Sequence, residues 1–209
     1  MKVYKGSTPV KIYNGNHKMP KIYKGSTLLC SDTYNYHYRV PNLVSNGDFA
    51  DATGWTGTAA TISAASNTLS VMGTGAGQYP TAYQQLAIPT IGNKYAITFR
   101  LRALDDACKS LFYRYGMSAA AVLVTNPVVG QWYTGVVIIT CDNAYRNISF
   151  FHGYLNAAAA NGKVMEVQYV SCVDLTALES DLGIEITQEN YEDWISKLPD
   201  QYIDQFRMW

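Results

Sequence analysis

A short motif occurs three times in the first thirty residues, and its size constrains what this segment can fold into. The units begin at Lys2, Lys11 and Lys21, and each reads Lys, a β-branched residue, Tyr, any residue, Gly. This pattern predicts a short strand that leads into a turn. Because one such unit cannot bury a core, we expect it to stack on its neighbours or on other chains. The repeat therefore predicts an assembly or attachment region over residues 1–40.

Length and charge exclude several classes of protein. The chain has 209 residues and a formal net charge of zero, and 15% of its residues are charged. This length fits one domain with appendages, and the absence of a basic patch argues against nucleic-acid binding. No apolar run follows the first Met and no stretch of about 18 apolar residues occurs, so we expect neither a signal peptide nor a membrane span. The 17 tyrosines suit recognition surfaces and subunit contacts, although β-rich proteins also carry many tyrosines.

The cysteines give no indication of a metal site. Cys30, Cys108, Cys141 and Cys172 are far apart and form none of the C-x-x-C pairs that bind zinc. We expect buried thiols, which fits assembly in a reducing cytoplasm. The sequence leaves a disulfide open.

Residues 41–176 have the pattern of an all-β domain, because short apolar runs alternate with Gly and Asn-Gly. Residues 95–102 alternate apolar and polar, which predicts a strand with one buried face. Residues 136–139 are all apolar and predict a strand buried on both faces. About ten short strands with regular turns predict a two-sheet jelly-roll sandwich. We expect these strands at 42–45, 59–63, 68–72, 83–88, 94–102, 110–115, 121–124, 132–140, 146–152 and 164–173.

The sequence changes character after the β domain. Thr187 has the features of a helix N-cap, and apolar residues then recur at helical spacing up to Pro199, which ends this helix and can open a second one. We therefore expect a helical tail over residues 177–209. Residues 157–160 are alanines that lie between two expected strands and precede Asn-Gly, and we expect a loop there.

One segment resembles a known family. Residues 42–55 read N-L-V-S-N-G-D-F-A-D-A-T-G-W, and this resembles the opening strand of carbohydrate-binding-module-like jelly rolls with a galactose-binding-type fold. The usual pattern is N-L-[VI]-x-N-G-[DS]-F-E followed by G-W, so Ala50 stands where the family has an acid. Residues 130–133, G-Q-W-Y, match the family's G-x-W entry into a core strand, and 173–176 resemble its closing strand.

The resemblance implies a structural cation. Family members tie the opening loop to the closing strand through carboxylate and backbone oxygens around Ca²⁺, and the matching acids here are Asp48, Asp51 and Asp174. Ala50 removes one acid from that pattern. The alternative is that these acids act in ordinary turns and Asx caps. No cofactor is otherwise required.

A sugar site would need aromatic rings for stacking and planar hydrogen-bonding groups around them. In residues 110–115, Leu111, Tyr113 and Tyr115 share one face of the expected strand, while Phe112 and Arg114 share the other. The alternative for each aromatic residue is a place in the core or in a subunit interface. The candidate carbohydrate-binding residues are Arg100, Arg102, Tyr113, Tyr115, Tyr79 and Tyr83.

A second resemblance is narrower. Residues 174–177, D-L-T-A, and 187–194, T-Q-E-N-Y-E-D-W, are similar to a signature of bacteriophage and prophage tail proteins, although the linker at 179–186 departs from the family's Gly-rich one. The N-terminal repeats also look similar to the start of phage tail and fibre proteins. Together these imply a virion structural protein of the tail, baseplate or a fibre, assembled in the bacterial cytoplasm. It would attach to other virion proteins through its repeats, form homotrimers and present its jelly roll to host surface glycan.

Two alternatives stay open. The jelly roll would serve as an assembly scaffold in a head or neck fibre or decoration protein that binds no glycan, or the protein would be a glycan depolymerase. His17, His37 and His152 are scattered, and no catalytic motif such as G-x-S-x-G or H-E-x-x-H occurs. Glycoside hydrolysis needs two acids across one cleft, and acids are sparse in the β domain. We therefore expect a protein that is not an enzyme.

Overall fold

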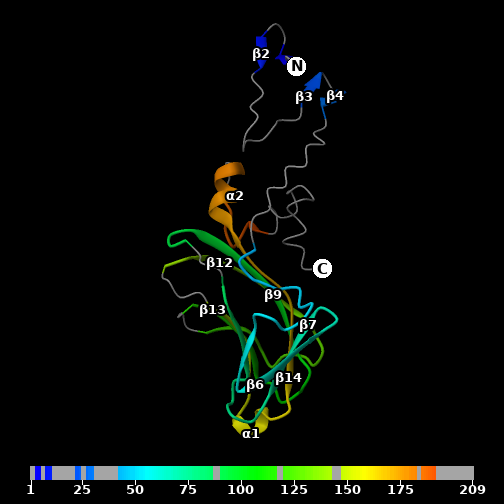
Figure 1. Ribbon diagram of the computed structural model, residues 1–209, viewed down its shortest axis with the longest axis vertical. Coiled ribbons are helices and arrows are strands. Elements are labelled where there is room, and N and C mark those ends of the chain that lie inside the picture. The colour runs from blue at the N-terminus through cyan, green and yellow to red at the C-terminus, as the bar shows by residue number, and fades with distance from the viewer. Residues whose placement is uncertain are drawn as a thin grey trace.

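The computed structural model describes residues 3–5, 8–10, 22–24, 27–30, 42–86, 90–116, 120–142, 147–182 and 185–191. Most of them form two five-stranded antiparallel sheets packed face to face (Figure 1). This arrangement confirms the predicted all-β jelly-roll sandwich. Within the described residues, no helix is long and apolar enough to cross a membrane.

Each sheet takes strands from the whole length of the domain. The first sheet has the order β11-β10-β13-β8-β5 and the second has β12-β9-β14-β7-β6. The strands of the first sheet are β5 (Thr56–Thr58), β8 (Thr81–Gln85), β10 (Ser110–Tyr115), β11 (Ala121–Thr125) and β13 (Asn147–Gly153). Those of the second sheet are β6 (Ala60–Ala65), β7 (Thr68–Gly73), β9 (Lys94–Ala103), β12 (Tyr133–Thr140) and β14 (Val164–Asp174).

The expected strand at 42–45 is wrong, and Asn42 gives the reason. This residue makes one isolated bridge with Val173. Its side-chain oxygen then accepts hydrogen bonds from the backbone N–H groups of Val44 at 3.1 Å and Cys172 at 2.8 Å. Because the side chain takes bonds that a strand ladder would make, the chain turns away instead of pairing further. The remaining expected strands each have a counterpart, and β5 is an additional strand.

The interpretation of residues 136–139 as buried on both faces is also wrong. They belong to β12, an outer strand of the second sheet, and their side chains are half-buried. The side-chain amide of Gln188 lies along the outer edge of this strand. Its Oε1 accepts from the N–H of Ile138 and its Nε2 donates to the carbonyl of Val136, both at 3.0 Å. The side chain thus satisfies backbone groups that β12 would otherwise present unpaired.

Two short helices lie at opposite ends of the sandwich (Figure 1). α1 (Ala157–Ala160) stands where a loop was expected, and the Asn156 side chain caps it by accepting from the N–H of Ala159 at 2.9 Å. α2 (Leu175–Leu182) follows β14 directly. The helices expected after Thr187 fall largely outside the described residues.

The N-terminal repeats form hairpins where they are described. β1 (Val3–Lys5) pairs with β2 (Thr8–Val10), and β3 (Ile22–Lys24) pairs with β4 (Thr27–Cys30). The first and third units therefore each contain the predicted strand, paired with the residues that follow it. The predicted turns at 6–7 and 25–26 and the second unit, over residues 11–19, lie outside the described residues.

The core between the sheets is centred on aromatic rings. Phe150 lies 4.8 Å from Phe99 and 6.0 Å from Trp55, measured between ring centroids. Phe49 packs on Trp55 at 5.3 Å. Phe49 and Trp55 come from the opening loop, so this loop contributes to the core although it is not a strand.

Cysteines occupy the same interior. Cys108, Cys141 and Cys172 are all buried, and Cys108 and Cys172 carry free thiols, which confirms the expectation for these two. Burial raises the pKa of Cys108 to about 11 and that of Cys172 to about 12. Both groups are therefore protonated and unreactive near neutral pH.

His152 makes the stability of this core depend on pH. The residue is fully buried, its Nδ1 lies 2.8 Å from the hydroxyl of Tyr154, and burial lowers its pKa from 6.5 to about 3. Above pH 6.5 the imidazole ring of His152 is mainly neutral in both the folded and the unfolded chain, so this group makes stability depend little on pH there. As the pH falls from 6.5 towards 3, the unfolded chain takes up this proton first and stability is lost. We expect about 2 kcal/mol less stability at pH 5 than at pH 7.5 from this group.

Urea unfolding at the two pH values measures this loss, and His152→Gln is the matched variant. The variant is expected to be less stable at pH 7.5, but to lose less than the wild type on acidification. Equal losses in both proteins would assign the pH dependence to other groups.

Candidate functional site

The outward face of the first sheet combines a polar row and an aromatic row. Tyr83, Ser149 and Arg114 stand opposite one another across β8, β13 and β10. One step along the same face, Phe151 of β13 stands opposite Phe112 of β10. Because side chains on one face of a strand are two residues apart, the rows are about 7 Å from each other.

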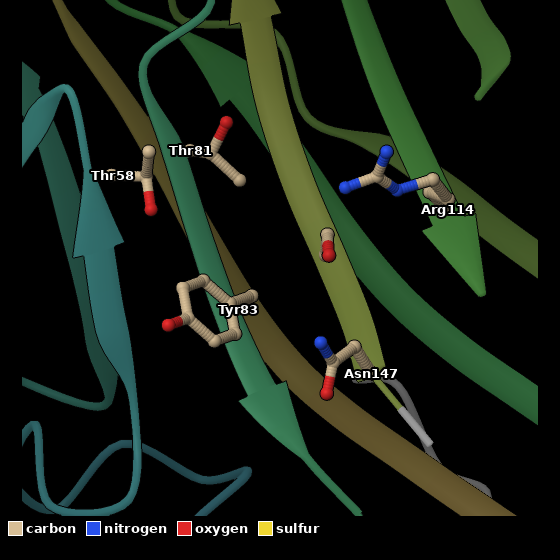
Figure 2. Close-up of a pocket in the computed structure, with 6 residues that line it drawn as sticks. Thr58, Thr81, Tyr83, Arg114 and Asn147 are labelled. Atoms are coloured by element: carbon tan, nitrogen blue, oxygen red, sulfur yellow. The ribbon is translucent and has the colours of Figure 1, made fainter. Parts of the chain in front are cut away.

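The polar row forms part of a shallow pocket of about 240 Å³. Figure 2 shows Thr58 and Tyr83 on one flank and Arg114 on the other, with the guanidinium of Arg114 extending towards Thr81. These groups are hydroxyls, an amide and a guanidinium, which are suited to hydrogen-bonding a polar ligand. The pocket is lined by Thr58, Thr81, Tyr83, Arg114, Asn147 and Ser149.

The aromatic row is a three-ring cluster beside this pocket. Phe112 and Phe151 stack with centroids 5.0 Å apart and planes at 9°. The ring of Tyr79 meets both edge-on, at 5.9 Å from Phe112 and 6.1 Å from Phe151. Tyr79 is 46% exposed, so the cluster presents an aromatic surface to solvent. Rings held in this way offer a stiff apolar platform next to polar groups.

Two of the six predicted carbohydrate-binding residues lie on this face, and two others pack against the core. Tyr83 lines the pocket and Tyr79 belongs to the aromatic cluster. Tyr113 and Tyr115 project from the other side of β10 and pack against the core, with Tyr113 at 5.2 Å from Phe99. Burial raises the pKa of the Tyr115 hydroxyl above its usual value. Their positions alternate with Phe112 and Arg114, as the strand pattern predicted.

Arg100 and Arg102 lie on the second sheet instead. They are in β9, whose alternate residues Phe99 and Leu101 face the core, so the two arginines project from the outside of that sheet. Both guanidinium groups lie over the ring of Trp132, at 5.2 Å and 4.4 Å from its centroid. Arg102 also forms a salt bridge with Glu166 at 2.5 Å. The six predicted residues are therefore divided among two surfaces and the core.

Two of the three acids predicted to bind calcium accept hydrogen bonds from neighbouring protein groups. Asp51 accepts from the N–H of Thr53 at 2.7 Å and from Asn46 at 2.8 Å, and the bond from Thr53 holds the pKa of this exposed carboxyl below its usual value. Asp174 accepts from Asn93 at 2.7 Å and from the N–H of Thr176 at 2.9 Å, in the first turn of α2. Asp48 is exposed. In the part of the chain that the structure describes, no three acidic, His or Cys side chains form a metal-binding group. Calcium binding stays a prediction from the resemblance.

The sequence reasoning missed most of the pocket. The strand pattern put Phe112 and Arg114 on one face, as observed, but the predicted carbohydrate-binding residues of this strand were Tyr113 and Tyr115, on the other face. The signal that separates them is Leu111, which shares its face with Tyr113 and Tyr115 and marks that face as the core side. Thr58, Thr81, Asn147 and Ser149 carry no such signal, since small polar residues occur on any exposed strand.

Comparisons with known proteins give the following likenesses. The sequence matches no protein-family model and no curated protein. Among solved structures, an arabinose-bound GH51 α-L-arabinofuranosidase matches 65% of this chain at a TM-score of 0.48 and 14% identity, and the match spans 26% of the enzyme. A family 16 carbohydrate-binding module matches 63% of this chain and 99% of its own length, at a TM-score of 0.45 and 14% identity. The enzymatically active domain of bacteriophage CBA120 tailspike protein 4 matches 64% of this chain and 21% of its own length, at a TM-score of 0.43 and 15% identity. At TM-scores below 0.5, these likenesses assign neither a family nor a ligand to the chain.

Proposed function

We propose that this protein binds carbohydrate, without cleaving it, on the outward face of the first sheet. The observation that carries the proposal is the juxtaposition of the three-ring cluster, in which Tyr79 is exposed, and the polar pocket on adjacent rows of one sheet. Sugars present apolar C–H faces and a fringe of hydroxyls, and these need an aromatic platform with hydrogen-bonding groups beside it. The resemblance of residues 42–55 to carbohydrate-binding-module-like jelly rolls agrees with this function.

Binding is favoured over hydrolysis by the composition of the pocket. Glycosidases place two carboxyl groups on either side of the scissile bond. The six residues that line the described pocket include no Asp or Glu. Two acids elsewhere in the domain, Asp105 and Glu166, are each held in a salt bridge, with Lys163 and Arg102 respectively. The pocket therefore offers hydrogen bonds and stacking, and we assign it a binding role.

The sequence resemblances extend the proposal to a bacteriophage particle. In this setting the N-terminal hairpins attach the chain to other virion proteins, and the sandwich presents its carbohydrate-binding face to the host surface. Several weak sites on one particle would act together, so that avidity supplies the affinity. Native mass spectrometry of the purified chain tests the homotrimer implied by this arrangement, and a monomer at micromolar concentration would count against it.

The binding face is tested by removing one outward-facing ring beside each sheet. Tyr79→Ala takes away the exposed edge of the aromatic cluster, and we expect it to weaken binding to glycans that score on an array by about tenfold, because each stacked ring contributes roughly 1 kcal/mol or more. Trp132→Ala is the matched control, since it removes a half-buried ring from the outside of the second sheet. Isothermal titration of both variants against the best array ligand gives the comparison.

Three outcomes are distinct. Loss of affinity confined to Tyr79→Ala places the ligand on the first sheet, as proposed. Loss confined to Trp132→Ala would move the site to the surface that holds Arg100 and Arg102. An array without any ligand would favour the role of an assembly scaffold.

A further inference from the structure

The charge of the candidate pocket points to a particular class of sugar. Arg114 is exposed at the pocket wall, and within the described residues no hydrogen-bond or ion-pair partner occupies its guanidinium. The other five lining residues are uncharged. By contrast, Arg102 on the second sheet is held by Glu166 and stacks on Trp132. Arg114 is therefore the charged group of the pocket and its donors are available to a ligand.

The chemistry of this group favours an anion over a neutral sugar. A guanidinium presents a planar pair of N–H donors that match the two oxygens of a carboxylate, and such charge-assisted pairs are stronger than bonds to hydroxyls. Ser149 stands opposite Arg114 in the register and Tyr83 stands opposite Ser149, so hydroxyl groups continue the row away from the guanidinium. A carboxylated ring seated on Arg114 would place its own hydroxyls along that row.

The aromatic cluster gives such a ligand a second contact. Phe112 is two residues from Arg114 on the same strand and the same face, which puts the stacked rings next to the guanidinium. Each residue of a polyuronic or polysialic acid offers both groups, a ring face for stacking and a carboxylate for pairing. We propose that the pocket recognises a sugar carboxylate, as in a uronic or sialic acid, through Arg114. This inference rests on the proposed carbohydrate-binding function.

The test compares polymers that differ only in their carboxyl groups. Binding of the full chain to polygalacturonate, alginate and polysialic acid is measured by titration calorimetry, each beside its carboxyl-reduced counterpart. For every acidic polymer that the protein binds, we expect the affinity to be at least tenfold higher than for its carboxyl-reduced form. Arg114→Gln should abolish this difference, and Arg114→Lys should restore part of it, since Lys keeps the charge but loses the paired donors.

Lys109→Gln is the matched control for charge. Lys109 is an exposed cation just before β10 that does not line the pocket, so its loss changes the net charge equally without touching the site. We expect this variant to keep the preference for acidic polymers. Thermal melting of all variants should coincide with the wild type, because both side chains are exposed.

The results separate the two levels of the proposal. Equal binding of acidic and reduced polymers, or an Arg114→Gln variant that keeps the preference, overturns the inference but leaves carbohydrate binding intact. An equal effect of Lys109→Gln also overturns it, because general charge attraction would then explain the preference. Absence of binding to every polymer, acidic or reduced, counts against both.

Discussion

Gly47→Ala is expected to destabilise the protein by about 3 kcal/mol or more, because a Cβ at this position would overlap the carbonyl oxygen of Val170. The clash is between two backbones, so a change of rotamer cannot relieve it. The N–H of Val170 donates to the carbonyl of Gly47 at 2.9 Å, and Tyr169 beside it has a φ of 51° in the bulge of β14. Moving either segment breaks this bond.

The loss should spread to the core. Gly47 begins the turn that carries Phe49, and Phe49 packs on Trp55. If the loop is displaced from β14, both rings leave the interior, and the fluorescence of the buried Trp55 reports the change. Urea unfolding followed by tryptophan fluorescence therefore gives both the stability and the state of the loop.

Gly77→Ala is the control for this substitution. A Cβ at Gly77 meets only the Cβ of Ala59, at 3.2 Å, so we expect a change below about 1 kcal/mol. A Gly47→Ala variant as stable as the Gly77→Ala variant would show that the opening loop does not depend on its close approach to β14.

Phe150→Ala and Phe151→Ala should differ in their effects on stability and on ligand affinity, although the two residues are adjacent in β13. Phe150 is fully buried between Phe99 and Trp55, so its removal leaves an enclosed cavity and is expected to cost about 3–5 kcal/mol. Phe151 projects from the opposite side of β13, between Phe112 and Tyr79, and is 8% exposed. We expect that loss to be about 2–3 kcal/mol, because the exposed ring of Tyr79 can move into part of the space.

Affinity for the array ligand should follow the reverse order. Phe151→Ala disrupts the aromatic platform and is expected to weaken binding about tenfold or more, whereas Phe150→Ala, measured below its melting temperature, should retain the wild-type affinity. Differential scanning calorimetry and titration calorimetry on both variants measure the two properties. A Phe150→Ala variant that loses affinity while it remains folded would mean that the face depends on the core beneath it.

The sequence predicted the fold well because the relevant signal is local. Regular Gly and Asn-Gly punctuation marks the turns between the strands. The alternation in 95–102 predicted one buried face, and β9 follows it from Phe99 onwards, whereas Ala96 and Thr98, on the same side as Arg100, are buried as well. β5 lacked this signal, since Thr-Gly-Thr contains no apolar residue. α2 begins at Leu175, two residues before the expected helical tail, and extends into residues 179–186, which the resemblance to phage tail proteins implied to be a linker; its leucines at 175, 178 and 182 have helical spacing.

The candidate site was harder to predict because it depends on which sheet each strand joins. Alternation shows that Arg100 and Tyr83 face away from a core, but it does not show that β9 and β8 belong to different sheets. The rows of the pocket bring together Thr58 and Asn147, which are far apart in the chain, through pairings that only the three-dimensional register defines. Asp174 illustrates the same limit, because its role in the first turn of α2 depends on where that helix begins, and the helical tail was expected to begin at residue 177.

The amide of Gln188 has a consequence for how copies of this chain associate. An edge strand with unpaired backbone N–H and C=O groups can pair with a strand of a neighbouring molecule, and repeated pairing of this kind builds filaments. At β12 the side-chain amide of Gln188 already occupies part of this edge, through its two hydrogen bonds to the backbone of Val136 and Ile138. Pairing of another strand with β12 would first have to break these two hydrogen bonds, so this edge is protected against sheet-to-sheet association.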